Sequence, residues 1–590
     1  MMKSHILLAS TFVLAAGCTA VDAKQCQLDS ECGATEVCQG ATTATLGTCE
    51  ARPTPVATAC HEDFDCAVGE VCLATVCTAA ASATAPRTFG IASMSFTAGT
   101  EQYLVAVYAP PLGAAAGNEP AIDFTFAAPS AASGALTIAR VRNASVTSTD
   151  LVPGAAFDAA RRARIDGLVE DLNAGRISLA GAVTKSASCG DCGTKMCWGG
   201  ACVDTNIALK FASANKTVTC DLAAVVTSGG VKVNVLLDQA NAAAKTVVVD
   251  AATKFAASFA KEVALLGQTG HTGVLDRDGD GRITVAFTDT TTADIGLDKI
   301  GFFDVNDFLP AGISGATGNE TDILWSRVPA PSGVDLAIGT LVHEYTHLAG
   351  YALRVQARNN AALRESGWLD EALASIMEDQ TGWGGSNIAY ASAALGQWNS
   401  CTYAGNAQSQ IDSPAQRGKA FLLLRNIIDQ DARTAGATST TSAQVATAAT
   451  TLISGLLIEA KLGWEHAIFQ NRSRDVLGQM LVAAYTTHNP AVTAAGAGAY
   501  DFLTLATPSG SSYPIGVDPY HTYKDAKGVD VSLGGPDFID IDPTSSKLSE
   551  NTIESSGTLT YLVSGGAGQV TLRGQALAAR DVRLTVKRVQ

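Results

Sequence analysis

The pattern of apolar and polar residues predicts β-strands in the middle of the chain and near both of its ends. The alternation is clear in 282–288 and 582–586, and further strands are predicted at 103–108 and 231–237. Alternation is typical of a strand with one buried face, whereas a short apolar run is typical of a fully buried strand. We expect a small β domain over 89–152 and a C-terminal β-sandwich over 510–590.

Helical spacing dominates the stretch between these β segments. Apolar residues recur three and four positions apart in 157–175 and 251–266, and helices are predicted from 334 to about 490. The pattern therefore predicts an α+β, multidomain protein in which residues 206–505 form a mainly helical domain with a β-sheet. The length of 590 residues allows several domains of ordinary size.

The N-terminus has the pattern of a secretory signal, which we assign to residues 1–17. Lys3 precedes an apolar run, 6–16, that is too short to span a bilayer. The segment ends in a Leu-Ala-Ala-Gly-Cys sequence that resembles the lipobox of bacterial lipoproteins, although Ala15 stands where a large aliphatic residue is usual. We expect an exported protein that is anchored at the cell surface through a lipidated Cys18, with plain secretion as the alternative.

Of the other fourteen cysteines, twelve form three clusters that favour disulfides in an oxidising compartment, and Cys220 and Cys401 remain outside them. Residues 18–80 hold two clusters that share the spacing Cys-x5-Cys-x5-Cys, which indicates a duplicated small module, and 81–88 forms a linker. Residues 153–205 combine a helix with a third cluster, formed by Cys189, Cys192, Cys197 and Cys202. The Cys-x2-Cys start of this cluster would also suit a zinc ribbon, but the exported context favours disulfides.

Charge and hydropathy narrow the range of partners. Forty basic and fifty-six acidic residues give a net charge of -16. This charge repels phosphate backbones and argues against nucleic acid as a partner. No internal apolar run approaches the roughly 18 to 20 residues that span a bilayer. The oligomeric state cannot be read from the sequence.

The run His343-Glu344-Tyr345-Thr346-His347 lies inside a stretch with helical spacing. Residues four positions apart share one face of a helix, so both imidazoles can bind one Zn²⁺ while Glu344 reaches a metal-bound water. Ser332 and Asp335 are placed to cap this helix at its N-terminus. The less informative interpretation is a helix with two surface histidines, and a third ligand would decide between the two.

Glu371 is the candidate for that third ligand. It lies in a second amphipathic helix, 368–378, with Ser366 as its candidate cap, and the 24 residues after His347 allow this helix to return beside the first. Two histidines and a glutamate, with water in the fourth position, form a hydrolytic zinc site. The third histidine of the metzincin pattern is missing, because Leu353 occupies its position.

An ordered series of motifs resembles the hyicolysin-type neutral zinc metallopeptidases, within the gluzincin group that includes thermolysin. The series consists of Asp276–Thr284, Gly301–Phe303, Asn319–Leu324, His343–His347 and Trp368–Glu378, so the resemblance covers about residues 205 to 490. It implies that His343, His347 and Glu371 bind zinc and that Glu344 is the general base. Ala372 and Ser375 depart from the family pattern, in which Gly and a supporting Asp are common. This leaves Ser375, Asp370 and Glu378 as candidates to orient the ligands.

The sequence offers several candidates for a second donor to the oxyanion, and it does not select one. In related enzymes a tyrosine or histidine further along the chain often fills this role. The candidates are Tyr390, Tyr403, His466, Tyr485 and His488.

A second metal is suggested by Asp276, Asp278 and Asp280, which match the start of a calcium-binding loop. The match is partial, because Phe287 stands where the loop of an EF-hand has its bidentate Glu. An Asp- and Gly-rich turn without metal would have the same composition. Ca²⁺ is therefore a candidate second metal besides the Zn²⁺ cofactor, and the metal-free turn stays open as the alternative.

Together these features predict an exported zinc-dependent endopeptidase that acts on protein or peptide substrates. The aminopeptidase alternative is less favoured, because the chain lacks the Gly-x-Met-Glu-Asn run that binds a free α-amine in aminopeptidase relatives. A further alternative is a surface adhesin or binding lipoprotein with a structural or vestigial metal site.

Overall fold

The computed structural model divides the chain into two compact units, Met1–Cys66 with Cys72–Thr78, and Ala67–Val71 with Ala79–Gln590. The residues that the structure describes are 25–26, 36–39, 47–51, 70–73, 76–79, 87–96, 102–108, 122–127, 137–141, 171, 189, 192–211, 216–289, 300–309, 318–360, 363–398, 413–470, 476–492, 501–525, 528–536, 538–541, 551–553, 558–564, 568–576 and 583–589. The expected signal, Cys18 and the cysteine pairing within 18–80 lie outside the described side chains.

The cysteine-rich segment contains five short strands. They are β1 (Gln25–Cys26), β2 (Glu36–Gln39), β3 (Gly47–Ala51), β4 (Glu70–Leu73) and β5 (Val76–Ala79). The first three form an antiparallel sheet in the order β1-β3-β2, and β4 pairs with β5.

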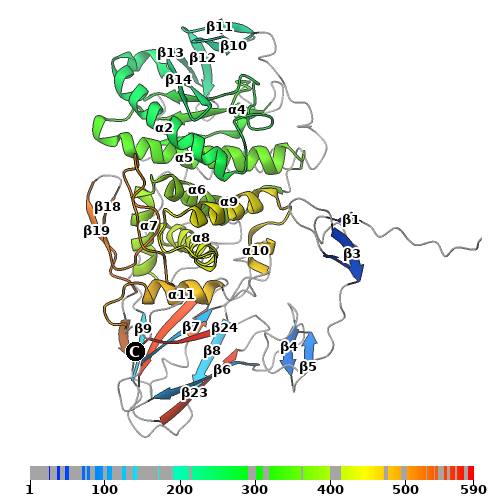
Figure 1. Ribbon diagram of the computed structural model, residues 1–590, viewed down its shortest axis with the longest axis vertical. Helices are drawn as coiled ribbons and strands as arrows, with labels where there is room; N and C mark the ends of the chain where they lie inside the picture. Colours follow the sequence, from blue (N-terminus) through cyan, green and yellow to red (C-terminus); the bar gives the residue numbers. More distant parts are fainter. Residues whose placement is uncertain are drawn as a thin grey trace, which may run out of the picture. The chain divides into compact units, whose positions relative to one another are not determined.

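A six-stranded mixed sheet forms the upper part of the second unit (Figure 1). Its strands lie in the order β12-β13-β14-β15-β17-β16. The three central ones, β14, β15 and β17, are parallel, and the remaining neighbours are antiparallel. Their bounds are β12 (Ile207–Phe211), β13 (Lys216–Ser228), β14 (Val231–Asp238), β15 (Arg282–Phe287), β16 (Gly301–Phe303) and β17 (Ile323–Ser326).

Two long helices cover one face of this sheet. Helix α2 (Lys245–Leu265) packs on β13 and β14, α5 (Val334–Gly350) packs on β16 and β17, and the two helices contact each other. Val233, Val235 and Val285 point into the core under these helices. Their neighbours Leu236 and Ala286 belong to a separate core on the opposite face. Alternate residues of β14 therefore face opposite sides of the sheet, and on the side away from the helices Leu236 joins the second core while Asn234 is buried and hydrogen-bonded to Thr284.

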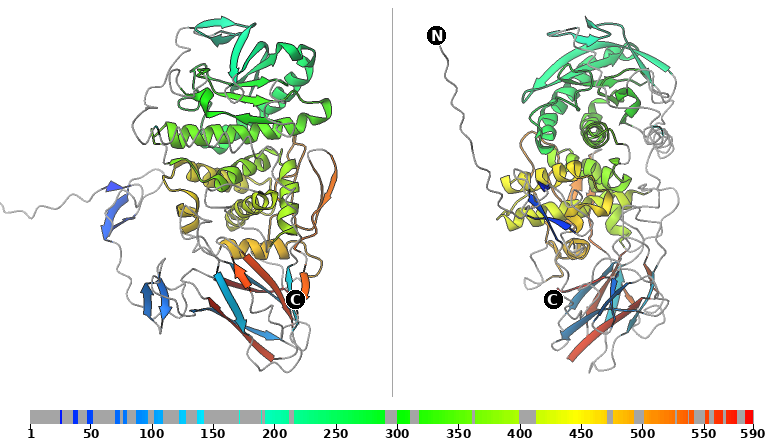
Figure 2. Two further views of the ribbon diagram at one scale, coloured as in Figure 1. Left: turned by 180° about the vertical axis from the view of Figure 1, so that it is seen from behind. Right: turned by 90° about the vertical axis from the view of Figure 1, so that its right-hand side faces the viewer.

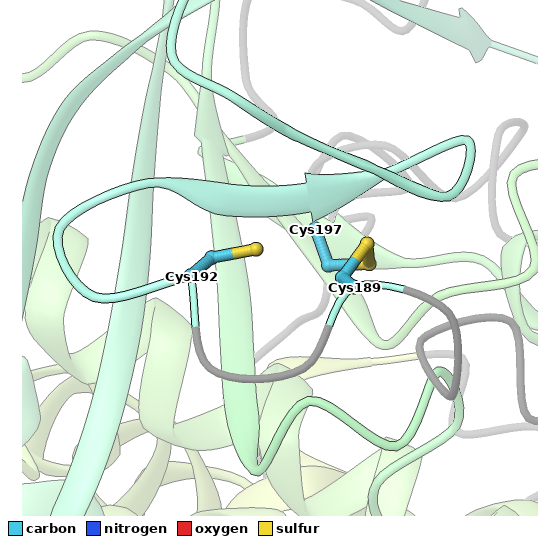
Figure 3. Close-up of side chains that lie close together, drawn as sticks. All are labelled: Cys189, Cys192 and Cys197. Carbon is cyan, nitrogen blue, oxygen red and sulfur yellow. A yellow bond between two sulfur atoms is a disulfide. The ribbon is translucent and has the colours of Figure 1, made fainter.

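The opposite face is bordered by a small disulfide hairpin. Strands β10 (Met196–Trp198) and β11 (Ala201–Val203) are antiparallel, and Met196 packs into the same core as Leu236. Cys189 pairs with Cys197 and Cys192 with Cys202, with Cα–Cα distances of 5.9 and 5.4 Å. Figure 3 shows the Cys189–Cys197 bond beside Cys192. This confirms the expectation of disulfides in the third cluster and leaves its cysteines unavailable for a zinc ribbon.

A mainly helical layer lies on the other side of α5 (Figures 1 and 2). Helix α6 contacts α5 and α8, and α7 packs against α8. The helices that follow α5 in the chain are α6 (Gly367–Thr381), α7 (Gly385–Gly396), α8 (Pro414–Thr434), α9 (Ala443–Ile458), α10 (Ala467–Gln470) and α11 (Val476–Thr486). A short helix, α4 (Val305–Phe308), follows β16. A mixture of helices and sheets confirms the α+β class.

The two β segments near the ends of the chain form common sheets. One sheet has the order β20-β9-β22-β7-β24 and the other β21-β8-β23-β6. The strands before residue 152 are β6 (Arg87–Phe96), β7 (Gln102–Tyr108), β8 (Ile122–Ala127) and β9 (Thr137–Val141). Those after residue 510 include β20 (Phe538–Ile541), β21 (Asn551–Ile553), β22 (Thr558–Ser564), β23 (Gly568–Ala576) and β24 (Arg583–Arg588).

The expectation of two separate β domains, 89–152 and 510–590, is therefore wrong. Strand β7 lies between β22 and β24 and pairs with both, and β23 lies between β8 and β6. Each segment supplies strands whose hydrogen-bonding partners come from the other one. Local alternation predicts that a segment forms a strand. It does not indicate which strand, several hundred residues away, will pair with it. A short hairpin, β18 (Thr522–Lys524) with β19 (Asp530–Ser532), stands apart from these sheets.

Within the part of the chain that the structure describes, no helix combines the length and apolar character needed to cross a bilayer.

Candidate metal centre

Helix α5 carries both predicted histidine ligands on one buried face. His343 and His347 are 8% and 7% exposed, and their rings lie 4.7 Å apart between centroids. The opposite face holds Leu341, Val342 and Tyr345 in the core. The predicted Ser332 cap is wrong, because residues 331–333 form a separate 3-10 turn and α5 begins after Gly333. Pro331 favours that extra turn, since its fixed φ suits the first position of a helical segment.

Helix α6 brings Glu371 to the two histidines. Glu371 Oε2 lies 3.1 Å from His343 Nε2, and Oε1 lies 3.8 Å from His347 Nε2. Donors held 2.0–2.2 Å from a tetrahedral zinc ion are about 3.3–3.6 Å apart, and the two measured distances, 3.1 and 3.8 Å, lie on either side of this range. The three residues, all buried, have ligand atoms within 4.8 Å of one another. The structure therefore assembles the predicted ligand set.

The far side of each imidazole faces a carboxylate. Glu378 Oε1 lies 2.7 Å from His343 Nδ1, and Asp370 Oδ2 lies 3.0 Å from His347 Nδ1, although only the first pair has hydrogen-bond geometry. Such contacts fix the tautomer and orient the ring of a ligating histidine. Of the three predicted supporting residues, Glu378 thus fills this role, and Asp370 lies at ion-pair distance from His347 without hydrogen-bond geometry. Ser375 does not fill this role, because its buried hydroxyl has no partner among the described residues.

Glu344 lies beside the edge strand β16. The backbone N–H of Phe303 donates a hydrogen bond of 2.9 Å to Glu344 Oε2. Strand β16 is the last strand of the sheet and runs antiparallel to β17. The contact holds the carboxylate in one orientation on the same helix as the histidines, as a general base requires.

Arg417 and Tyr390 complete the surroundings of Glu371. Arg417, on α8, places Nη2 2.8 Å from Glu371 Oε2, and its guanidinium lies 5.2 Å from the centre of the Tyr390 ring. Sequence reasoning named Tyr390 as an oxyanion donor candidate but missed Arg417. No local signal marks Arg417, because α8 approaches α6 only through tertiary packing.

Three of the remaining oxyanion candidates have other partners. His466 is fully buried, with Nε2 2.7 Å from Glu365 and Nδ1 3.1 Å from Glu459. His488 pairs with Asp518 at 2.6 Å. Tyr485 packs in a small core with Leu104 and Val589. Tyr403 lies outside the described residues. Of the five candidates, Tyr390 is therefore the one that the described structure brings to Glu371.

The charged side chains around the proposed ligands shift one another's pKa values. Burial raises the pKa of Glu371, but the Arg417 guanidinium and the hydrogen bond to His343 outweigh it and hold this pKa well below its usual range. Burial lowers the pKa of His343, yet its hydrogen bonds to Glu371 and Glu378 raise it to about 10 in the metal-free protein. Glu371 is therefore in the charged form that a metal ligand needs.

The residues present fit a zinc ion. Two imidazoles, which bind zinc in their neutral form, and one carboxylate are the donor set of hydrolytic zinc sites. Both ring nitrogens of His347 are buried and make no hydrogen bond to the described residues. A buried polar atom without a partner costs about 1–3 kcal/mol, and a metal bond would satisfy Nε2.

The predicted calcium loop brings its three aspartates together and adds two residues that the sequence did not reveal. Asp276, Asp278 and Asp280 have ligand atoms within 4.8 Å of one another, and Asp276 forms a second such group with His271 and Asp322. Positive φ angles at Gly279 and Gly281 let the loop fold back on itself. Burial, followed by the charges of Asp322 and Asp280, raises the pKa of Asp278 well above its usual range. Ca²⁺ at this loop stays a prediction.

Comparison of the chain with protein-family models, with curated proteins and with solved structures found no match. The interpretation of the site therefore rests on its own geometry.

Proposed function

We propose that the protein is a zinc-dependent endopeptidase whose ligands are His343, His347 and Glu371. The observation that carries the proposal is the convergence of these three buried side chains within 4.8 Å, with a carboxylate behind each imidazole. A lone His-Glu-x-x-His helix with solvated histidines would need neither the glutamate nor the supporting carboxylates.

Zinc, when bound, supplies Lewis acidity and a water of lowered pKa. Glu344, held by the Phe303 N–H, takes a proton from the attacking water as its oxygen adds to the carbonyl carbon of the substrate. The same carboxyl group then gives the proton to the leaving amine nitrogen as the C–N bond breaks. His343 keeps its orientation through its hydrogen bond to Glu378, and Asp370 supplies a negative charge 3.0 Å from His347 Nδ1.

A peptide substrate is favoured by the resemblance of the ordered motifs from Asp276 to Glu378 to zinc metallopeptidases. Endopeptidase is preferred to aminopeptidase because the chain lacks the Gly-x-Met-Glu-Asn run. Export, with lipidation at Cys18 or plain secretion, is part of the proposal and rests on the sequence of residues 1–18.

The test is the variant Glu344→Gln, compared with wild type and with Asp335→Asn, a control in the first turn of the same helix. We expect one zinc per chain in all three proteins by metal analysis. Casein cleavage should fall by at least about 100-fold in Glu344→Gln, since a general base contributes about 10²–10⁴. Cleavage that survives in Glu344→Gln would contradict the mechanism. A wild type without zinc and without cleavage would favour a surface adhesin or binding lipoprotein.

A further inference from the structure

Arg417 directly contacts the third ligand of the proposed zinc site. Its Nη2 lies 2.8 Å from Glu371 Oε2, the same oxygen that His343 Nε2 approaches at 3.1 Å. The side chains of Arg417 and Glu371 are 11% and 9% exposed, so water screens this pair weakly. A charge-assisted bond of this kind is shorter and stronger than a neutral one.

The surroundings of Arg417 fix its own position. Helix α8 begins with a complete capping box, in which Ser413 and Gln416 bond each other's backbone. Arg417 lies one residue further, and its guanidinium lies 5.2 Å from the centre of the Tyr390 ring on α7. A planar guanidinium held by an aromatic ring is preorganised, so little conformational freedom is lost when it binds a carboxylate.

The two oxygens of Glu371 have different neighbours as a result. Oε2 is engaged by Arg417, whereas Oε1 faces His347 Nε2 at 3.8 Å. A carboxylate without such a partner can rotate, or can offer both oxygens to one cation. Each oxygen of Glu371 therefore faces one imidazole, and the bond from Arg417 to Oε2 holds the carboxylate in this rotation.

We propose that Arg417 is a positioning residue that fixes the rotation in which the Glu371 carboxylate faces the two imidazoles and is presented to zinc. The inference rests on the proposed function and adds a residue to that same site. If Arg417 positions Glu371, its loss weakens zinc binding, whereas the effect of its charge alone would be the opposite. By Coulomb's law, removal of a nearby positive charge would strengthen cation binding. Loss of a positioning contact would weaken it.

The experiment uses the full chain, stripped of metal and reloaded with Zn²⁺ or with Co²⁺ as a spectroscopic probe. The variants are Arg417→Gln and Arg417→Lys, and Arg433→Gln is the matched control. Arg433 lies on the same helix, but its described bonds go to the backbone carbonyls of Asp501 and Phe502. Zn²⁺ affinity is measured by competition with a chelator, and the visible absorption of bound Co²⁺ reports its coordination.

We expect Arg417→Gln to bind Zn²⁺ about 10–100-fold more weakly, the usual effect of losing a residue that orients a ligand. Its Co²⁺ absorption should change in position or intensity, Arg417→Lys should recover part of the affinity, and Arg433→Gln should match wild type. If Arg417→Gln does not fold, Tyr390→Leu should shift affinity and absorption in the same direction by a smaller amount.

Unchanged or tighter metal binding in Arg417→Gln, with an unchanged Co²⁺ spectrum, would overturn the inference. If wild type still bound zinc and cleaved casein in that case, the proposed function would stand without it. Failure of the proposed function gives a different result, because wild type itself would then bind no zinc at this site.

Discussion

Glu262 is a buried carboxyl group on α2 without a hydrogen-bond partner in the part of the chain that the structure describes. It is 0% exposed on α2, and neither oxygen has a hydrogen-bond partner among the described residues. Burial alone raises its pKa well above the usual value of 4.5. A raised pKa in the folded state means that the native protein binds a proton more tightly than the unfolded chain. Stability is therefore lost as pH rises from about 4.5 through the folded-state pKa.

We expect Glu262→Met to stabilise the protein by about 1–3 kcal/mol, the cost of one unsatisfied buried polar group. The two side chains have similar volume, so little repacking is needed. The gain should be largest above the folded-state pKa and should shrink as pH falls toward 4.5. Thermal unfolding across this pH range measures it, with the exposed Glu465→Met as control. A variant that is less stable than wild type at every pH would mean that Glu262 has a partner.

Individual residues of the zinc site were predictable when their chemistry followed from local spacing. His343, Glu344 and His347 lie within five residues of one helix, and Glu371 lies in the next predicted helix. Arg417 was not predictable, because the sequence pattern of a helix is the same whether its arginine faces solvent or a metal ligand. The Ser332 cap failed for a local reason, since the 3-10 turn at Pro331 delays the start of α5.

At the scale of elements, the aspartate loop is connected to the zinc helix by buried side chains. Asp322, next to β17, bonds His271 Nε2, and His271 Nδ1 lies 3.2 Å from the hydroxyl of Tyr345 on α5. The Tyr345 ring packs edge-on against Phe259 of α2, 4.6 Å between centroids. Order in the loop should therefore support α5. The sequence showed the three aspartates, but the additional His271 and Asp322 come from outside the motif.

We expect Ca²⁺ to raise the unfolding temperature of the wild-type protein, because it would offset several buried carboxylates that now repel one another. The variant Asp278→Asn should lose most of this response, and the exposed Asp250→Asn on α2 should keep it. Thermal unfolding of calcium-stripped protein, with Ca²⁺ added back at constant ionic strength, separates site binding from screening. Equal responses in all three proteins would indicate an Asp- and Gly-rich turn without a specific cation.

At the scale of the whole molecule, the two shared β-sheets make the two ends of the second unit interdependent. Described contacts also tie these sheets to the helices, since Trp398 Nε1 donates to Thr560 Oγ1 at 3.2 Å and α11 contacts β7 and β24. The local pattern of apolar and polar residues predicted strands at both ends correctly, but it could not show that they pair. The division into 89–152 and 510–590 therefore failed at the level of strand neighbours, while the strands themselves were found.

A fragment of residues 205–590 should consequently fold poorly. It lacks β7 and β9, so β22 loses both of its neighbours, and it lacks β6 and β8, which flank β23. Unpaired strands expose backbone donors and acceptors that promote aggregation. We expect this fragment to be insoluble or to unfold at least several degrees below a fragment of residues 79–590, which keeps every strand of both sheets. Soluble expression, circular dichroism and thermal unfolding of the two fragments provide the comparison. Equal stability would mean that the N-terminal strands add nothing to the two sheets, and it would restore the picture of two independent β domains.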